Sequence, residues 1–136
     1  MKRHNPIAVL KSYEAIYAHA VEVPAVARTV YVSGQVGVGG DGKLVDGGFE
    51  EQCRQAIANI EAVLAAARMT LENIVKVTVF LTRREDLISL RDVRARHLAV
   101  APAVTVLLVA GLHDPNWLVE IEAVAAAMPT NNEDNS

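Results

Sequence analysis

Apolar residues return every three or four positions between residues 49 and 69. An α-helix turns once every 3.6 residues, so this spacing gathers them on one side and predicts an amphipathic helix. Glu50 and Glu51 fall in its first turn, where negative charge is favourable. The predicted apolar face consists of Phe49, Cys53, Ala56, Ile57, Ile60, Val63, Leu64 and Ala67. The predicted polar face consists of Glu50, Glu51, Arg54, Gln55, Asn59 and Glu61.

Strand patterns lie on both sides of this helix. Residues 17–23 and 29–33 are rich in β-branched and aromatic residues and are separated by Pro24, which predicts two antiparallel strands. Residues 102–125 are typical of two further strands joined by a turn, which would form a closing hairpin. Residues 74–81 predict a strand because alternate positions are apolar. One face of that strand would carry Val75, Val77, Val79 and Leu81.

A second helix is predicted to begin at Asp86 or a neighbour, and its inner stripe would consist of Leu87, Leu90, Val93 and His97. The resulting order, β-β-α-β-α-β-β, contains no repeat and no linker, which predicts one domain over residues 1–128. The polar residues 129–136 are expected to form a disordered tail. Two helices on one face of a mainly antiparallel sheet make an α+β fold. The other face would then be bare and rich in valine, which favours oligomerisation.

The charge of the chain is nearly balanced, with 13 Lys and Arg against 16 Asp and Glu. A nucleic-acid binder needs a concentrated basic face, so the composition argues against nucleic acid as a partner. Cys53 is the single cysteine, which excludes an intrachain disulfide and favours a reducing compartment. No apolar run approaches the roughly 20 residues of a membrane span, and the longest, residues 104–112, suits a buried strand. We therefore expect a cytoplasmic protein that makes no membrane contact.

Several residues with chemical potential have simpler explanations. The glycines between residues 34 and 48 predict turns, because no helix follows them at the spacing of a phosphate-binding loop. Cys53 on the apolar helix face favours a buried thiol over a nucleophile. The arginines between residues 83 and 96 alternate with acidic residues, which favours a solvated helix face over an RNA patch. His97 is expected to pack or to cap, and no histidine pair has zinc-site spacing among His4, His19, His97 and His113.

Glu120 and Glu122 are the most informative polar pair. Side chains repeat every second residue in a strand, so both carboxylates are expected on one face. They form either a solvent-exposed stripe or a site in which one carboxylate orients a water or polarises a substrate nitrogen. Ser33, at a strand end before Gly34, offers either ordinary turn chemistry or a hydroxyl for that site. Tyr17 either covers such a cleft or fills the edge of the core.

These landmarks, in their order along the chain, resemble the Rid (YjgF-like) family, the reactive-intermediate deaminases. The resemblance covers roughly residues 17–126 and rests on short segments. They include Val-Ser-Gly-Gln-Val at residues 32–36, Ile-Val-Lys-Val-Thr-Val-Phe-Leu at residues 74–81, Pro-Ala at residues 102–103 and Val-Glu-Ile-Glu-Ala-Val-Ala at residues 119–125. It implies a chorismate-mutase-like α+β fold, a homotrimer with small-molecule clefts between subunits, and no metal or organic cofactor.

The resemblance also implies roles for single residues. In deaminating members an arginine clamps the substrate carboxylate, a glutamate matching Glu120 positions the attacking water, and residues matching Ser33 and Tyr17 line the cleft. The substrates are enamines or imines. This chain has Val104 at the position of the clamp and Val106 where a cysteine is often found. Valine offers no donor to a carboxylate, so an ordinary 2-imino acid deaminase is disfavoured.

Two functions stay open on the sequence alone. The first is a divergent Rid enzyme that hydrolyses an imine, an enamine or a related small metabolite, with Glu120 as its catalytic residue. The second is a non-catalytic trimer that binds a small metabolite or a partner protein in a cleft made more apolar by Val104 and Val106. Another arginine could replace the clamp, and the sequence does not place one. The candidates are Arg28, Arg91, Arg94 and Arg96.

Overall fold

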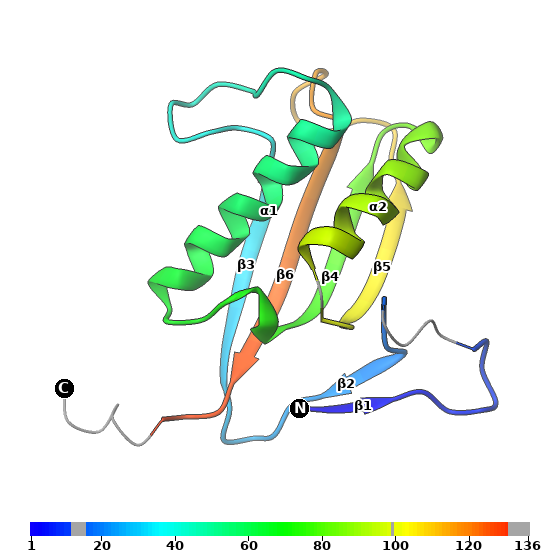
Figure 1. The fold of residues 1–136 in the computed structure, drawn as a ribbon, viewed down its shortest axis with the longest axis vertical. Helices are drawn as coiled ribbons and strands as arrows, with labels where there is room; N and C mark the ends of the chain where they lie inside the picture. Colours follow the sequence, from blue (N-terminus) through cyan, green and yellow to red (C-terminus); the bar gives the residue numbers. More distant parts are fainter. Residues whose placement is uncertain (12–15, 99, 131–136) are drawn as a thin grey trace.

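The fold is built on a four-stranded sheet. In it, β3 (Arg28–Val36), β6 (Val119–Ala127), β4 (Ile74–Leu81) and β5 (Ala103–Leu108) are hydrogen-bonded in this order (Figure 1). β6 is antiparallel to both β3 and β4, whereas β5 runs parallel to β4. The structure is a computed structural model that describes residues 1–11, 16–98 and 100–130.

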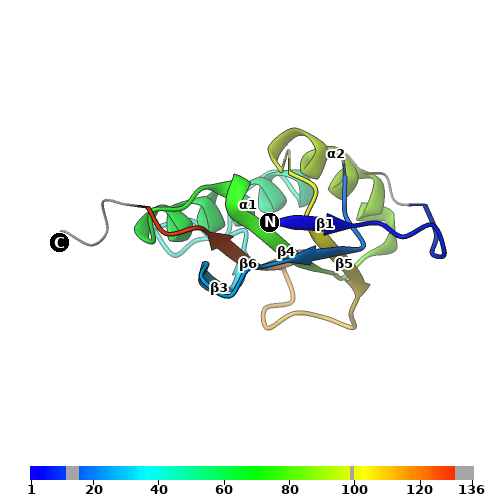
Figure 2. The same ribbon diagram turned by 90° about the horizontal axis from the view of Figure 1, so that it is seen from below.

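Two helices cover one face of this sheet. Figure 2 shows α1 (Phe49–Ala66) and α2 (Leu87–His97) side by side above the strands. The 3₁₀ turn Leu71–Asn73 lies between α1 and β4, and the 3₁₀ turn Arg84–Asp86 lies between β4 and α2. The α+β arrangement predicted from the sequence is therefore confirmed, with two of the three strand pairings in this four-stranded sheet antiparallel.

The core lies between the helices and the sheet. Alternate residues of β4 are buried, as predicted, because every second side chain of a strand points to the same face. The predicted helix at residues 49–69 is confirmed as α1, which ends three residues earlier, before Arg68 takes the left-handed conformation with φ 57°. Core residues from α1 and β4 include Cys53, Ala56, Ile60, Leu64, Val77, Val79 and Leu81.

The inner stripe of α2 was predicted partly wrongly. Leu90 and Val93 are buried, but Leu87 and His97 are exposed. The buried Leu98, one residue beyond the helix, closes the core at that end instead. Since α2 has only 11 residues and packs over the edge of the sheet, two of its residues suffice to contact the core.

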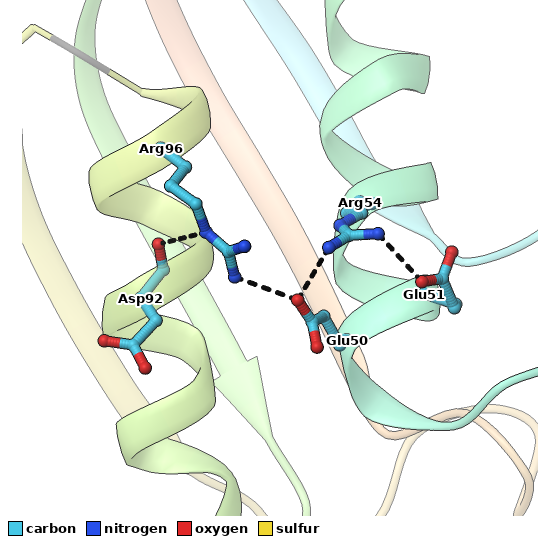
Figure 3. A network of polar contacts seen from close by, with 5 residues as sticks. All are labelled: Glu50, Glu51, Arg54, Asp92 and Arg96. Carbon is cyan, nitrogen blue, oxygen red and sulfur yellow. Dashed lines mark hydrogen bonds and ion pairs between the residues drawn. The ribbon is translucent and has the colours of Figure 1, made fainter.

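An ion network joins the exposed sides of the two helices (Figure 3). Glu50 of α1 accepts hydrogen bonds from Arg54 at 2.7 Å and from Arg96 of α2 at 2.9 Å. Arg54 also donates to Glu51 at 2.9 Å, and Arg96 donates to the backbone oxygen of Asp92. The hydrogen bond from Arg96 and the charge of Arg54 lower the pKa of the Glu50 carboxyl. For Arg96 this network confirms the predicted exposed helix face on which basic and acidic groups alternate.

The strand pairing differs from prediction in two places. The strands of residues 102–125 do not form a hairpin, because β4 lies between β5 and β6. β2 (Ala20–Glu22) does not pair with β3; it pairs with β1 (Lys2–His4), a strand that the sequence pattern does not indicate, in a separate two-stranded sheet. The apolar run 104–112 is an edge strand and a loop, not a buried strand, and Leu107 is 44% exposed.

The face of the sheet opposite the helices is mixed in chemistry. The prediction that it would be rich in valine is wrong, because the valines of β4 and β5 that pair side by side point to the helices. This open face carries Thr29, Tyr31, Lys76, Thr78, Phe80, Glu120, Glu122 and Val124.

The C-terminal tail follows β6. Of the predicted tail, residues 129 and 130 are exposed, and residues 131–136 lie outside the described part of the chain.

Within the described residues, no helix is both long enough and apolar enough to cross a membrane.

Candidate functional site

Glu120 lies on the open face of the sheet, near the start of the central strand β6. It stands opposite Phe80 of β4 and Val36 of β3, and Glu122 stands opposite Thr78. The two carboxylates share one face, as the alternation along the strand predicted.

Glu120 reaches across β3 at a residue without a side chain. A Cβ atom built on Gly34 would lie 2.8 Å from Cδ of Glu120, so the carboxylate occupies the space above this glycine. The register between β3 and β6 shifts between Val32 and Gln35, which marks an irregularity that holds Ser33 and Gly34. Ser33 is exposed there. We call Ser33, Gly34 and Glu120 the carboxylate cluster.

Two amides of α1 hold the strands that carry this cluster. Gln52, only 4% exposed, donates to the backbone oxygen of Asn116 at 3.1 Å and accepts from the backbone N–H of Leu118 at 2.9 Å. Both contacts lie just before β6 and Glu120. Asn59 donates to the carbonyl oxygens of Val36 and Val38, at 3.0 and 2.9 Å, just after Gly34.

The positioning role of these amides is absent from the sequence prediction. Asn59 was assigned to the polar face of the helix, but it is half-buried against the end of β3. Gln52 falls beside Phe49 and Cys53 on the apolar face, and a lone amide at such a position is a signal of a buried hydrogen bond. The amide at this position predicts a buried hydrogen bond but does not identify the other residue, because that residue lies more than 60 positions away in the sequence.

The other predicted site residues lie around a cavity on the helix side of the sheet. This α2 cavity has a volume of about 260 Å³, between α2, β5 and the segment at residues 16–17. A hydrogen bond from the N–H of Ala18 to the oxygen of Pro102, at 2.9 Å, ties that segment to β5. The cavity is lined by Ile16, Tyr17, Leu87, Leu90, Arg91, Arg94 and Val106.

Val104 belongs to the same side as this cavity. It pairs in register with Val77, and Val106 pairs with Val79, and both partners lie in the core under the helices. Val104 and Val106 therefore face α2, two residues apart on one strand. Neither residue can reach the open face on which Glu120 lies.

The predicted site thus divides into two groups within one chain. Ser33 and Glu120 lie on the open face, toward the edge strand β3. Tyr17, Val104 and Val106 lie toward the opposite edge strand β5, on or near the helix side. The sheet separates the two groups.

The structure also places the four arginines that the sequence left unplaced. Arg91 and Arg94 line the α2 cavity. Arg96 contacts Glu50, and Arg28 donates to the carbonyl oxygen of Ala67 at the end of α1.

Cys53 and Gly42 behave as the simpler explanations predicted, whereas His97, which was predicted to pack or to cap, is exposed. Cys53 has no exposed surface, and burial raises the pKa of its thiol to about 12, so it is not a nucleophile near neutral pH. Gly42 has φ 79° in a turn closed by the hydrogen bond from Gly39 N–H to Lys43 O. Among the described residues, no group of three or more His, Cys, Asp or Glu side chains gathers as metal ligands would.

Comparison with known proteins gives consistent matches along most of the chain. Residues 10–127 match the family model described as Endoribonuclease L-PSP. A 2-iminobutanoate/2-iminopropanoate deaminase from Bos taurus is 39% identical over 127 residues, which cover 90% of this chain and 90% of the relative. Protein HMF1 from Saccharomyces cerevisiae is 35% identical over 114 residues, which cover 82% of this chain and 84% of the relative.

Solved structures agree with these matches. A Rid family protein of unknown function from Yersinia pestis superposes with a TM-score of 0.81 at 29% identity, covering 93% of this chain and 98% of that one. RidA from an Antarctic Psychrobacter superposes with a TM-score of 0.69 at 33% identity, covering 86% of this chain and 97% of that one.

Proposed function

This chain belongs to the endoribonuclease L-PSP family, to which the Rid proteins belong, and from that premise we propose that it hydrolyses the C=N bond of a small imine or enamine metabolite. The observation that supports this most directly is the carboxylate of Glu120, held over Gly34 on an open face by two strands that α1 fixes. Positioned carboxylates of this kind act as general bases toward water.

The proposed reaction adds one water and releases one amine. An enamine first tautomerises to the imine. Glu120 accepts a proton from the water as the water oxygen bonds to the imine carbon, and it passes this proton to the nitrogen, which gives a carbinolamine. The C–N bond then breaks as the hydroxyl proton moves through Glu120 to the nitrogen, so ammonia or an amine leaves and a carbonyl compound remains. Because no electron is transferred to an outside acceptor, protein groups and water suffice for this chemistry.

A complete site in this proposal needs two copies of the chain. The carboxylate cluster and the α2 cavity lie toward opposite edges of the sheet, so one chain cannot present both to one small molecule. In a homotrimer of cytoplasmic chains, Ser33 and Glu120 of one subunit would face Tyr17 and Val106 of its neighbour. The resemblance to Rid proteins implies such clefts between subunits.

Position 104 separates this protein from an ordinary 2-imino acid deaminase. Val104 offers no hydrogen-bond donor, so β5 cannot hold a substrate carboxylate as the resemblance implies for deaminating relatives. The name of the family model mentions ribonuclease activity, but we do not extend it to this chain, whose formal net charge is −3.

The test is keto acid release from 2-iminobutanoate, which an amino-acid oxidase generates in the assay. Glu120→Gln is expected to lower the enzyme-catalysed rate by about 10²- to 10⁴-fold, because the amide cannot accept the proton. Glu122→Gln is the matched control, since it removes a charge from the same face two residues away. Full activity of Glu120→Gln would show that its assigned role is wrong.

A second arm tests position 104. If wild type hydrolyses the imine, a cationic group other than residue 104 serves the cleft. If only Val104→Arg does so, the scaffold is competent and the natural ligand differs. If neither is active but a small metabolite binds saturably, the protein is the non-catalytic binder, and the proposed enzymatic function is wrong.

A further inference from the structure

Arg94 of α2 is a half-buried cation at the wall of the α2 cavity. It is one of the residues that line this cavity, and its partial burial lowers the pKa of its guanidinium. Within the described residues, the acceptor that its side chain reaches is the carbonyl oxygen of Ile16, at 3.4 Å. The Cys53 thiol nearby is neutral, because its pKa is raised to about 12.

Three other arginines close to α2, Arg54, Arg83 and Arg96, have carboxylate partners. Arg83 forms a two-pronged contact with Asp86 at 2.8 and 2.9 Å. Arg96 and Arg54 both contact Glu50. An anion stabilises a partly desolvated guanidinium. Among the described residues, none that lines the α2 cavity has an anionic side chain.

The rest of the cavity suits a short aliphatic molecule. Its apolar walls come from both sides: Leu87 and Leu90 from α2, Val106 from β5, and Ile16 from the segment beside it. The exposed Arg91 adds a second cation one helical turn before Arg94. The volume of about 260 Å³ admits a molecule of a few heavy atoms, with one charged end.

We propose that Arg94, together with Arg91, binds the carboxylate of the small molecule that this site receives, and so replaces the arginine absent from position 104. This inference rests on the proposed function, because it takes the α2 cavity to be part of the imine site. What is new here is the wall from which the carboxylate is held, which is α2 and not β5.

The position of Val104 explains how Arg94 could substitute for an arginine at residue 104. Val104 faces α2 from β5, next to Val106 on the same side of the strand. An arginine at residue 104 would approach the space between strand and helix from the strand, whereas Arg94 approaches it from the helix. The carboxylate would therefore be held from the opposite wall, and the reacting carbon would sit differently relative to Glu120.

The test measures binding without turnover, by NMR titration of 2-oxobutanoate, the keto acid expected as product. We expect Arg94→Met to weaken binding by about tenfold or more, which corresponds to 1.4 kcal/mol, and Arg91→Gln to weaken it by a smaller factor. Arg84→Gln is the matched control, because this exposed arginine does not line the cavity. The uncharged analogue 2-butanone should bind weakly and equally to all variants.

Further variants keep the test decisive if Arg94→Met folds poorly. Arg94→Lys keeps the charge but loses the two-pronged geometry, so it should fall between wild type and Arg94→Met. Adding Val104→Arg to Arg94→Met should restore affinity from the strand side. Circular dichroism and elution volume verify the fold of each variant.

The outcomes separate this inference from the proposed function. Equal binding of 2-oxobutanoate by wild type, Arg94→Met and Arg91→Gln, or no binding by wild type, overturns the inference. Arginine-dependent binding of inorganic phosphate without binding of 2-oxobutanoate overturns the assignment to a carboxylate. Glu120→Gln should keep full affinity while it loses turnover; retained turnover would contradict the role of Glu120 and leave the arginine result intact.

Discussion

At the scale of single residues, the carboxylate of Glu120 depends on the missing side chain of Gly34. The two residues lie on neighbouring strands, and the carboxylate fills the space that a Cβ atom would need. The glycine is required here by close approach, since its φ does not fall in the left-handed region. A glutamate held in this way has fewer positions available than one on an unobstructed strand face.

Gly34→Ala is therefore expected to lower activity while the protein stays folded. The added methyl group must displace the flexible end of Glu120, and a shift of about 1 Å in a catalytic group can lower a rate by about 10²-fold. Gly40→Ala is the control, because a Cβ atom there meets no heavy atom within 4 Å. Imine hydrolysis and thermal unfolding of both variants check this, and an active Gly34→Ala would contradict it.

Cys53 is expected to resist alkylation in the native protein. With no exposed surface and a thiol pKa of about 12, it should react with iodoacetamide at pH 8 only after unfolding in urea. The raised pKa means that the folded state retains the thiol proton. Its stabilising contribution is complete below the ordinary pKa of 9.0 and is lost as the pH rises through about 12.

The difference between wild type and Cys53→Ala isolates this effect from other alkaline titrations. Between pH 9 and 12, the free energy of unfolding of wild type should fall more steeply than that of the variant. Parallel curves, or rapid labelling of the native protein at pH 8, would show that the thiol is accessible.

At the scale of elements, α1 acts as the support for both strands of the carboxylate cluster. Gln52 and Asn59 are seven residues apart, which is two helical turns, so their side chains project from one side of the helix. One amide holds the approach to β6, and the other holds the exit from β3. A rigid helix thereby sets the relative position of two segments that are distant in sequence.

Gln52→Ala is expected to destabilise the fold by about 1–3 kcal/mol, because it leaves a carbonyl oxygen and an N–H without their partner. Urea denaturation measures this cost. The amide of Leu118 should also exchange faster with solvent, since it donates to Gln52. Glu61→Ala, an exposed change on the same helix, should leave both unaltered.

The sequence predicted the elements better than their partners. The strand Ile74–Leu81 and the body of α1 follow from periodic local patterns, and both lie where these patterns placed them. The pairing of β5 with β4 does not follow, because hydrogen bonding between strands depends on contacts distant in sequence. Arg94 shows the same limit. Its place among alternating charges predicted a solvated helix face, whereas in the structure it lines a cavity together with Val106 of β5.

At the scale of the whole molecule, the two faces of the sheet have different surroundings. Both helices cover one face (Figure 2), while Tyr31 on the other face is 80% exposed. Beside it lie Lys76, Thr78 and Glu122, around a hollow of about 200 Å³. A large exposed aromatic residue among polar groups is typical of the surfaces through which chains associate.

We expect light scattering to give three times the chain mass of 14.6 kDa. Tyr31→Glu should dissociate this trimer, because it adds a negative charge next to Glu122 on the open face. Imine hydrolysis should fall with it, since the proposed site needs two chains. A monomeric wild type with full activity would contradict the shared site.

The order of the strands has a consequence for synthesis on the ribosome. β6 is made after every other described strand, yet it lies between β3 and β4 and is bonded to both (Figure 1). Until it emerges, the nascent chain holds two unjoined strand edges, each able to pair with another polypeptide. The four-stranded sheet therefore cannot form before β6 is synthesised. A chaperone that shields the edges of β3 and β4 would act before that point.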